Sequence, residues 1–239
     1  MPTRMRSSPW LVLLLLCLPG LAGAFPLGLV DDFEDGTTEN WVVGLLGMPH
    51  PAPPINIANG GPDGDGDNYL RLTSVGGAAA GSRLVIINEE QWAGDYTIPD
   101  DSPLDRYVIQ GWVNNFINND LFLRVLLENP MGAPPTDIAI SDAVMVPAGS
   151  GWVPFEIPLG PDDLTVLLGS LDALLPNVTA IRLLHSQAGL FPGEPIVLEI
   201  GLDDLFATGI VVDFPEPGTL GLFLIAFAAL GAARRPRWR

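Results

Sequence analysis

The sequence predicts an all-β domain, a sandwich or a barrel, between two membrane-directed end segments. Short runs of alternating apolar and polar residues recur along the middle of the chain, glycine- and proline-rich turns separate them, and helical spacing is rare. Frequent short strands with such turns are typical of sandwiches and barrels. No internal repeat and no second domain boundary is visible. We therefore expect one domain over residues 25–212.

About eight to ten strands are expected in this domain. Tyr69–Thr73 alternates cleanly between apolar and polar residues, as a half-buried strand does. Leu121–Glu128 is almost wholly apolar and is typical of a central strand. Further strands are expected at 25–34, 83–88, 107–116, 138–146, 152–157, 178–185 and 196–208.

Two other segments have patterns that do not indicate strands. Residues 48–68 are rich in Pro, Gly, Asn and Asp, which predicts a long loop. Residues 162–175 follow Pro161 and carry leucines at helical spacing, which predicts a short helix. These leucines are Leu164, Leu167, Leu168 and Leu171.

The net charge of the chain limits the classes of partner that it can bind. The whole chain has a formal net charge of −17, and its eleven basic residues are all arginine. Between Phe25 and Phe214 five arginines stand against 27 acidic residues, a net charge of −22. Such a surface repels phosphate backbones and argues against nucleic-acid binding. It suits divalent cations, or simple solubility outside the cell.

Few residues offer catalytic chemistry. The single cysteine, Cys17, lies in the N-terminal segment, so a catalytic thiol or a cysteine zinc site is excluded from the domain. The chain has two histidines and no metalloprotease, nucleophile-elbow or nucleotide-binding motif. We assign no catalytic residue. Acidic residues are so numerous that a glycosidase-like pair would arise by chance, which leaves a glycan-acting hydrolase open.

Residues 1–24 have the three parts of a secretory signal peptide. Arg4 and Arg6 precede the apolar run Trp10–Leu18, and Ala22 and Ala24 supply a small-x-small cleavage site. The run is too short for a permanent membrane anchor. An uncut signal anchor is the alternative. Cys17 follows three leucines rather than small residues, which disfavours a lipoprotein.

The C-terminal end has an ordered set of signals. The motif Pro215, Glu216, Pro217 precedes an uncharged apolar stretch, about residues 218–233, and an arginine-rich end. At ~1.5 Å per residue this stretch forms a helix of roughly 24 Å, slightly short of a ~30 Å hydrocarbon core. The arginines would hold the chain end on the cytoplasmic side. An ordinary single-pass anchor is the alternative reading.

This C-terminal order, with a signal peptide upstream, resembles the PEP-CTERM sorting signal. In that family a membrane protease-transpeptidase, an exosortase, is thought to recognise the motif and remove the helix and tail. The resemblance covers residues 213–239. It implies the secretion machinery and an exosortase as partners in a Gram-negative-type bacterium. It also implies transient passage through the inner membrane and a final place at the cell surface or in the extracellular matrix.

Three short segments of the middle resemble a second family. They are 31–36 with Trp41 soon after, 149–159 around Trp152, and 198–205. Together they look like the antiparallel jelly-roll sandwich of galactose-binding-like, carbohydrate-binding modules. This resemblance implies a structural calcium where the first and last strands meet. Glu34 and Asp203 match its carboxylate ligands.

The acidic loop at residues 63–68 would lie near those ligands and add Asp67, because calcium prefers several oxygen ligands. The loop looks like the first half of an EF-hand but has Ser74 where that motif needs glutamate, so an EF-hand is rejected. The alternative is a turn without metal.

Sugar binding requires exposed aromatic rings. The candidates are Trp41, Trp92, Trp112, Trp152 and Tyr96. Trp92 and Tyr96 lie in the most loop-like segment and are the expected ligand-binding residues, with burial in the core as the alternative. Trp112 has the opposite strand parity to Val113.

These observations predict an exported surface or matrix protein, a non-catalytic binding or structural module associated with exopolysaccharide and sorted by an exosortase. A purely structural protein without a specific ligand is the alternative, and a glycan-acting hydrolase the second alternative.

Overall fold

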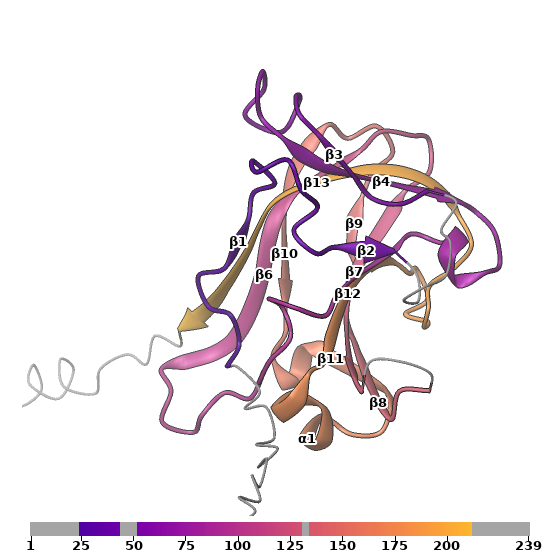
Figure 1. Cartoon of the computed structure of the whole chain (residues 1–239). Helices are drawn as coiled ribbons and strands as arrows, with labels where there is room; N and C mark the ends of the chain where they lie inside the picture. The colour runs from indigo at the N-terminus through magenta and orange to yellow at the C-terminus, as the bar shows by residue number, and fades with distance from the viewer. Residues whose placement is uncertain (1–23, 44–51, 131–133, 212–239) are drawn as a thin grey trace, which may run out of the picture.

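The computed structural model describes residues 24–43, 52–130 and 134–211 (Figure 1). The sorting motif Pro215, Glu216, Pro217, the predicted helix at 218–233 and nearly all of the predicted signal peptide, Ala22 included, lie outside these residues. In the part of the chain that is described, no helix has the length and apolar character needed to cross a membrane.

The described strands form two antiparallel sheets. Sheet I has the order β10-β6-β13-β4-β3, with β1 paired to β13, and sheet II has the order β11-β8-β7-β12-β5-β2, with β9 paired to β7. The predicted all-β sandwich is therefore confirmed. Sheet I consists of β1 (Val30–Asp31), β3 (Ile55–Ile57), β4 (Tyr69–Val75), β6 (Leu104–Asn115), β10 (Trp152–Pro158) and β13 (Val197–Val211). Sheet II consists of β2 (Val42–Val43), β5 (Val85–Asn88), β7 (Leu121–Asn129), β8 (Asp137–Ser141), β9 (Val144–Val146), β11 (Leu164–Leu168) and β12 (Ala180–His185).

The core lies between the sheets and follows from strand alternation. From Leu198 to Leu202 on β13 and from Leu121 to Leu127 on β7, every second side chain points inward and is buried, because successive side chains of a strand lie on opposite faces. Each such apolar side chain stabilises the fold by roughly 1.5–3 kcal/mol. The inward residues of these two strands include Leu198, Ile200, Leu202, Leu123, Val125 and Leu127.

The outer faces of the two sheets differ. On sheet II a second apolar cluster, which includes Ile87, Leu126 and Leu184, is itself buried. The segment 186–194 crosses part of this face, and a Cβ on its Gly193 would lie 3.5 Å from Leu184 Cδ1. On sheet I the outward positions of β6 and β10 include Gln110, Trp112, Trp152 and Glu156, none of which is buried. This part of the outer face of sheet I is therefore open to solvent.

The long strand β13 carries a bulge at its centre. It pairs with β4, β6 and β1, and its register against β6 shifts between Asp203 and Phe206. Asp204, inside the bulge, has a left-handed φ of 46°. Gly111 of β6 allows the close approach, since a Cβ there would lie 3.0 Å from the Asp203 carbonyl oxygen. A bulge re-aims side chains locally.

The predicted helix at 162–175 is wrong for most of its length. Residues 161–163 form the 3₁₀ turn η2, Leu164–Leu168 forms β11 on the edge of β8, and only Leu171–Leu174 forms the helix α1. The 3₁₀ turn η3 (Leu175–Asn177) follows. Thr165 and Val166 are β-branched and suit the edge strand. Gly169, with φ of 71°, separates the strand from the helix.

Three other expectations change in detail. The strand expected at 138–146 breaks into β8 and β9, and the loop expected at 48–68 contains β3. In the first expected strand, 25–34, only Val30–Asp31 pairs. Phe33 has a left-handed φ of 57°, which ends the extended conformation.

Candidate functional site

A shallow pocket opens on the outer face of sheet I, and strand alternation builds it. On β10, Phe155 points inward to the core, so Pro154 and Glu156 on either side of it point outward. The register pairs Pro154 with Trp112 and Glu156 with Gln110. Four outward side chains of two neighbouring strands thus meet.

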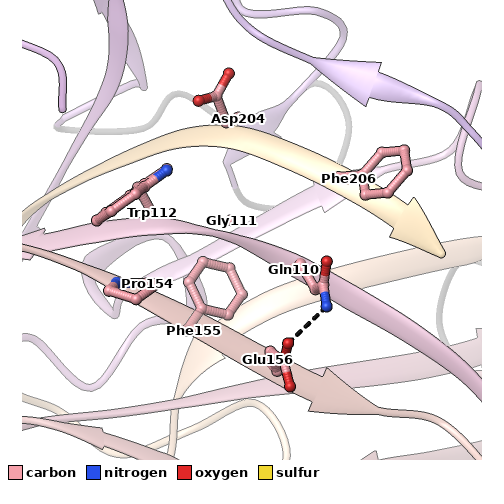
Figure 2. Close-up of a pocket in the computed structure, with 8 residues that line it drawn as sticks. All are labelled: Gln110, Gly111, Trp112, Pro154, Phe155, Glu156, Asp204 and Phe206. Atoms are coloured by element: carbon pink, nitrogen blue, oxygen red, sulfur yellow. Dashed lines mark hydrogen bonds between the residues drawn. The ribbon is translucent and has the colours of Figure 1, made fainter. Parts of the chain in front are cut away.

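The bulge of β13 completes the pocket, whose volume is about 230 Å³. Phe206 is paired with Gln110 and adds a second aromatic ring, and Asp204 adds a carboxylate. Figure 2 shows Trp112 and Phe206 on either side, Asp204 above, and Gln110 and Glu156 below. The full lining is Gln110, Gly111, Trp112, Pro154, Phe155, Glu156, Asp204 and Phe206.

The polar groups of the pocket are mostly acceptors. Gln110 Nε2 donates to Glu156 Oε1 at 2.6 Å, which fixes both side chains on the surface (Figure 2). Asp204 is exposed. Partial burial, with help from the nearby Asp67 and Asp63, raises the pKa of the Asp204 carboxyl above its usual range. The pocket therefore offers aromatic faces next to oxygens that accept hydrogen bonds from hydroxyl groups.

An aromatic cluster lies further along the same face. The Tyr69 and Trp152 rings meet edge to face with centroids 5.3 Å apart, and Phe116 lies 6.4 Å from Trp152. A Cβ on Gly201 of β13 would lie only 2.6 Å from Trp152 Cη2. The indole ring can therefore pack directly over the backbone of Gly201. Trp152 Nε1 donates to the Gly60 carbonyl at 2.9 Å, which ties this cluster to the loop 59–68.

The same loop contains Asp67 and covers Asp203, and the exposed Glu34 bonds to its last residue. Asp203 is only 1 % exposed, and a Cβ on Gly61 would lie 2.8 Å from its Oδ2 and 2.4 Å from Asp67 Oδ2. Glu34 Oε1 accepts the backbone N–H of Asn68 at 2.7 Å. Burial, followed by repulsion from nearby acids that include Asp67 and Glu34, raises the pKa of Asp203 to about 8.

The donor chemistry of this cluster suits calcium. The carboxylates of Asp67 and Asp203 are drawn together over Gly61, and among the described ion pairs none joins either of them to an arginine. A hard cation with oxygen ligands would offset that buried negative charge. In residues 24–43, 52–130 and 134–211, however, no three His, Cys, Asp or Glu side chains are grouped so that they could hold a metal ion.

Trp92 and Tyr96, the residues expected to bind a sugar, are both in the core. Trp92 is 0 % and Tyr96 is 1 % exposed. Trp92 Nε1 donates to Asp31 Oδ2 at 2.7 Å, and the Tyr96 hydroxyl donates to the Trp92 carbonyl at 2.7 Å. Neither ring offers a free face, so a stacking role is incompatible with their burial. A segment that looks loop-like in sequence can still fill the core when its polar atoms find partners inside.

The outward orientation of two aromatic side chains follows from the alternation of residues along their strands. Trp112 alternates with the core residue Val113, and Trp152 is three residues from the core residue Phe155, which places both on the outer face. Asp204 and Phe206 give no such signal, because the bulge between them and Asp203 shifts the alternation.

Comparisons with known proteins bear on the fold. No family model matches the chain, and no curated protein is similar to it. Among solved structures, an exo-β-agarase is 12 % identical with a TM-score of 0.50, and the match covers 87 % of this chain and 31 % of the agarase. At this identity the likeness shows a shared fold alone.

Two further structures are carbohydrate-binding modules. The family 11 module from Clostridium thermocellum, in complex with a β-1,3-1,4-mixed-linked tetrasaccharide, is 13 % identical with a TM-score of 0.47, over 77 % of this chain and 96 % of the module. The CBM22-1–CBM22-2 tandem of Paenibacillus barcinonensis Xyn10C is 14 % identical with a TM-score of 0.47, over 84 % of this chain and 49 % of the tandem. The sandwich expected for the domain rests on the two antiparallel sheets of the chain itself.

Proposed function

We propose that this protein is a non-catalytic glycan-binding module whose binding surface is the outer face of sheet I. The pocket at Trp112 would hold one sugar unit. The cluster of Tyr69, Phe116 and Trp152 would support the chain beyond it. The ligand is an extracellular polysaccharide.

The observation that carries this proposal is the composition of the pocket. The Trp112 and Phe206 rings can each cover an apolar C–H face of a pyranose, and Gln110, Glu156 and Asp204 can orient its hydroxyl groups. A largely preformed site with aromatic walls and a few fixed polar groups is typical of small-ligand recognition. Both sides of the pocket lie on paired strands rather than on loops, so little ordering is needed when the ligand binds.

Export and sorting complete the proposal. The signal peptide at residues 1–24 would take the protein to the secretion machinery. The tail at 213–239 would hold it transiently in the inner membrane until an exosortase processes it. Its destination would then be the cell surface or the extracellular matrix. Replacing Pro215, Glu216 and Pro217 by alanines should leave the protein in the membrane fraction, and unchanged release would contradict this part.

A bound calcium ion is also part of the proposal. Asp67 and Asp203 would hold it, with Glu34 joining from the segment after β1. The ion would supply positive charge beneath the loop 59–68. It would fix that loop, and with it Gly60, the hydrogen-bond partner of Trp152.

The test is glycan binding by the purified protein. On an array of polysaccharides the wild type should bind at least one glycan. Trp112→Ala should weaken that binding at least tenfold, or about 1.4 kcal/mol. Met145→Ala is the control, since Met145 is exposed on β9 of sheet II. A Trp112→Ala variant that is folded and binds like wild type would contradict the proposed surface.

A further inference from the structure

Each arginine of the described chain lies close to an acidic or a carbonyl oxygen. On the outer face of sheet I, Arg106 Nη2 lies 2.6 Å from Asp105 Oδ2 and its Nη1 lies 2.9 Å from Asp163 Oδ1. Arg71 Nη1 lies 3.9 Å from Glu199 Oε1. Each arginine of this face therefore has an acidic partner that offsets its charge.

The remaining arginines serve the interior and the loops. Arg182 makes a buried two-pronged contact with Glu128, at 2.6 and 3.1 Å. Arg83 donates to the carbonyls of Ala78 and Gly193, and Arg124 donates to three other carbonyls. The sequence contains no lysine.

Histidine adds no cation to the described surface. His185 is buried, and its Nδ1 accepts the backbone N–H of Phe122 at 3.2 Å, which requires an unprotonated nitrogen. Burial also lowers the pKa of His185 below its usual value.

The binding face itself carries uncompensated negative charge. Glu156 is exposed and is held by a neutral amide, that of Gln110, and Asp204 is exposed on the opposite side of the pocket. Arginine and lysine are the side chains that proteins favour for binding a carboxylate, sulfate or phosphate. A like charge brought against the face would be repelled. Hydroxyl groups, by contrast, are donors that carboxylates accept well.

We propose that the outer face of sheet I selects glycans without anionic groups and rejects polysaccharides that carry carboxylate, sulfate or phosphate. This selectivity rests on the proposed glycan-binding function and specifies its ligand class. The glycan hydroxyl groups would donate to Glu156 and Asp204 while its apolar faces cover Trp112 and Phe206.

The experiment compares matched glycans that differ in charge. Each neutral polysaccharide that the purified protein binds is converted into its carboxymethyl derivative and, as a steric control, into its hydroxyethyl derivative. Affinity is measured at low and at high salt, with EDTA and with calcium. We expect carboxymethylation to weaken binding at least tenfold and hydroxyethylation to have a much smaller effect. High salt should reduce the difference in affinity between the neutral and the carboxymethyl glycan, because it screens exposed charges.

Two variants test whether the weaker binding of the carboxymethyl glycan is caused by the outer face of sheet I. Glu156→Gln combined with Asp204→Asn should narrow the discrimination between the neutral and the carboxymethyl glycan. Asp172→Asn, which removes an exposed charge on α1 near sheet II, should leave it unchanged.

A failure of the proposed selectivity can be distinguished from a failure of the proposed glycan binding. Binding of the carboxymethyl glycan as tight as that of the neutral one would overturn the selectivity while leaving glycan binding in place, and so would tight binding to acidic glycans that requires calcium. Binding to no glycan at all would overturn the proposed function.

Discussion

Asp31 joins two parts of the core through one carboxylate. Its Oδ2 accepts the indole N–H of both Trp41 and Trp92 at 2.7 Å, and its side chain is buried. Buried tryptophans need a partner for that N–H. This contact explains why Trp92 is an interior residue rather than a ligand-binding one.

Removing this carboxylate should destabilise the protein. Asp31→Ala leaves two buried indole N–H groups without their acceptor, at about 1–3 kcal/mol each. We expect a loss of about 2–6 kcal/mol in the free energy of unfolding, measured by urea titration. Asp101→Asn, at an exposed turn, is the control. A loss equal to that of the control would mean that the indoles find other acceptors.

Glu39 beside Asp31 predicts a pH dependence. Burial, followed by the hydrogen bond and charge of Asp31, raises the pKa of Glu39 from its ordinary 4.5 to about 8. Its buried Oε2 otherwise has no hydrogen-bond partner, and a proton on Glu39 would supply a donor toward Asp31. Since the folded state holds this proton more tightly than the unfolded state, its contribution to stability is complete below pH 4.5 and is lost as the pH rises through about 8.

The measurement is the Tm of the wild type and of Glu39→Gln between pH 4 and 9. As the pH rises, we expect the Tm of the wild type to fall relative to the Tm of Glu39→Gln, which cannot ionise at this position. Asp203, whose pKa is also raised to about 8, adds a fall of the same sign in both proteins. Identical pH profiles for the two proteins would rule out the contribution of Glu39.

Among the elements, the bulge of β13 shapes both candidate sites. It turns Asp204 and Phe206 toward the pocket while Asp203 lies beneath the loop 59–68. Gly111 of the neighbouring strand leaves the room for it. The pocket thus depends on a backbone irregularity that two strands share.

Filling that room should damage the pocket. Gly111→Val introduces a side chain whose Cβ meets the Asp203 carbonyl, Leu205 and Phe155 at 3.0–3.1 Å. We expect a loss of about 1–3 kcal/mol in the free energy of unfolding, as for overpacked cores, together with weaker glycan binding. Denaturant titration and affinity measurements on the same preparation check this. Unchanged binding would mean that the bulge is not needed for the pocket.

The loop 59–68 predicts opposite effects of one substitution with and without calcium. In EDTA at pH 9, above the pKa of about 8 of its carboxyl, Asp203→Asn should raise the Tm, because it removes a buried charge that lies close to Asp67 and Glu34. Calcium should raise the Tm of the wild type, since a ligand of the native state stabilises it, and the variant should lose this gain. No calcium shift in the wild type would contradict the metal site.

For the whole molecule, the sandwich could be predicted because most of its strands are short runs, either alternating or wholly apolar, with turn residues between them. The expected strands 69–73, 121–128 and 178–185 correspond to β4, β7 and β12. The leucines of 164–168 were misleading because an edge strand and a helix can share their spacing, and the neighbour β8 decides between them.

The site could be predicted only in part. Parity indicates that Trp112 and Trp152 point outward. The burial of Trp92 depends on Asp31, which is 61 residues away in the sequence. The place of Phe206 depends on Gly111 of another strand. Contacts between distant segments leave no local pattern, so the sequence offered no guide to these two features.

The central claim is that a glycan binds to the outer face of sheet I. The most direct test is to follow the indole N–H signals of uniformly ¹⁵N-labelled protein by NMR while the glycan is added. Single Trp→Phe variants assign the four tryptophans of the described chain, Trp41, Trp92, Trp112 and Trp152. We predict that the Trp112 and Trp152 signals shift, while those of Trp41 and Trp92, bonded to Asp31 in the core, stay in place. Shifts at Trp41 and Trp92 with none at Trp112 and Trp152 would contradict the claim.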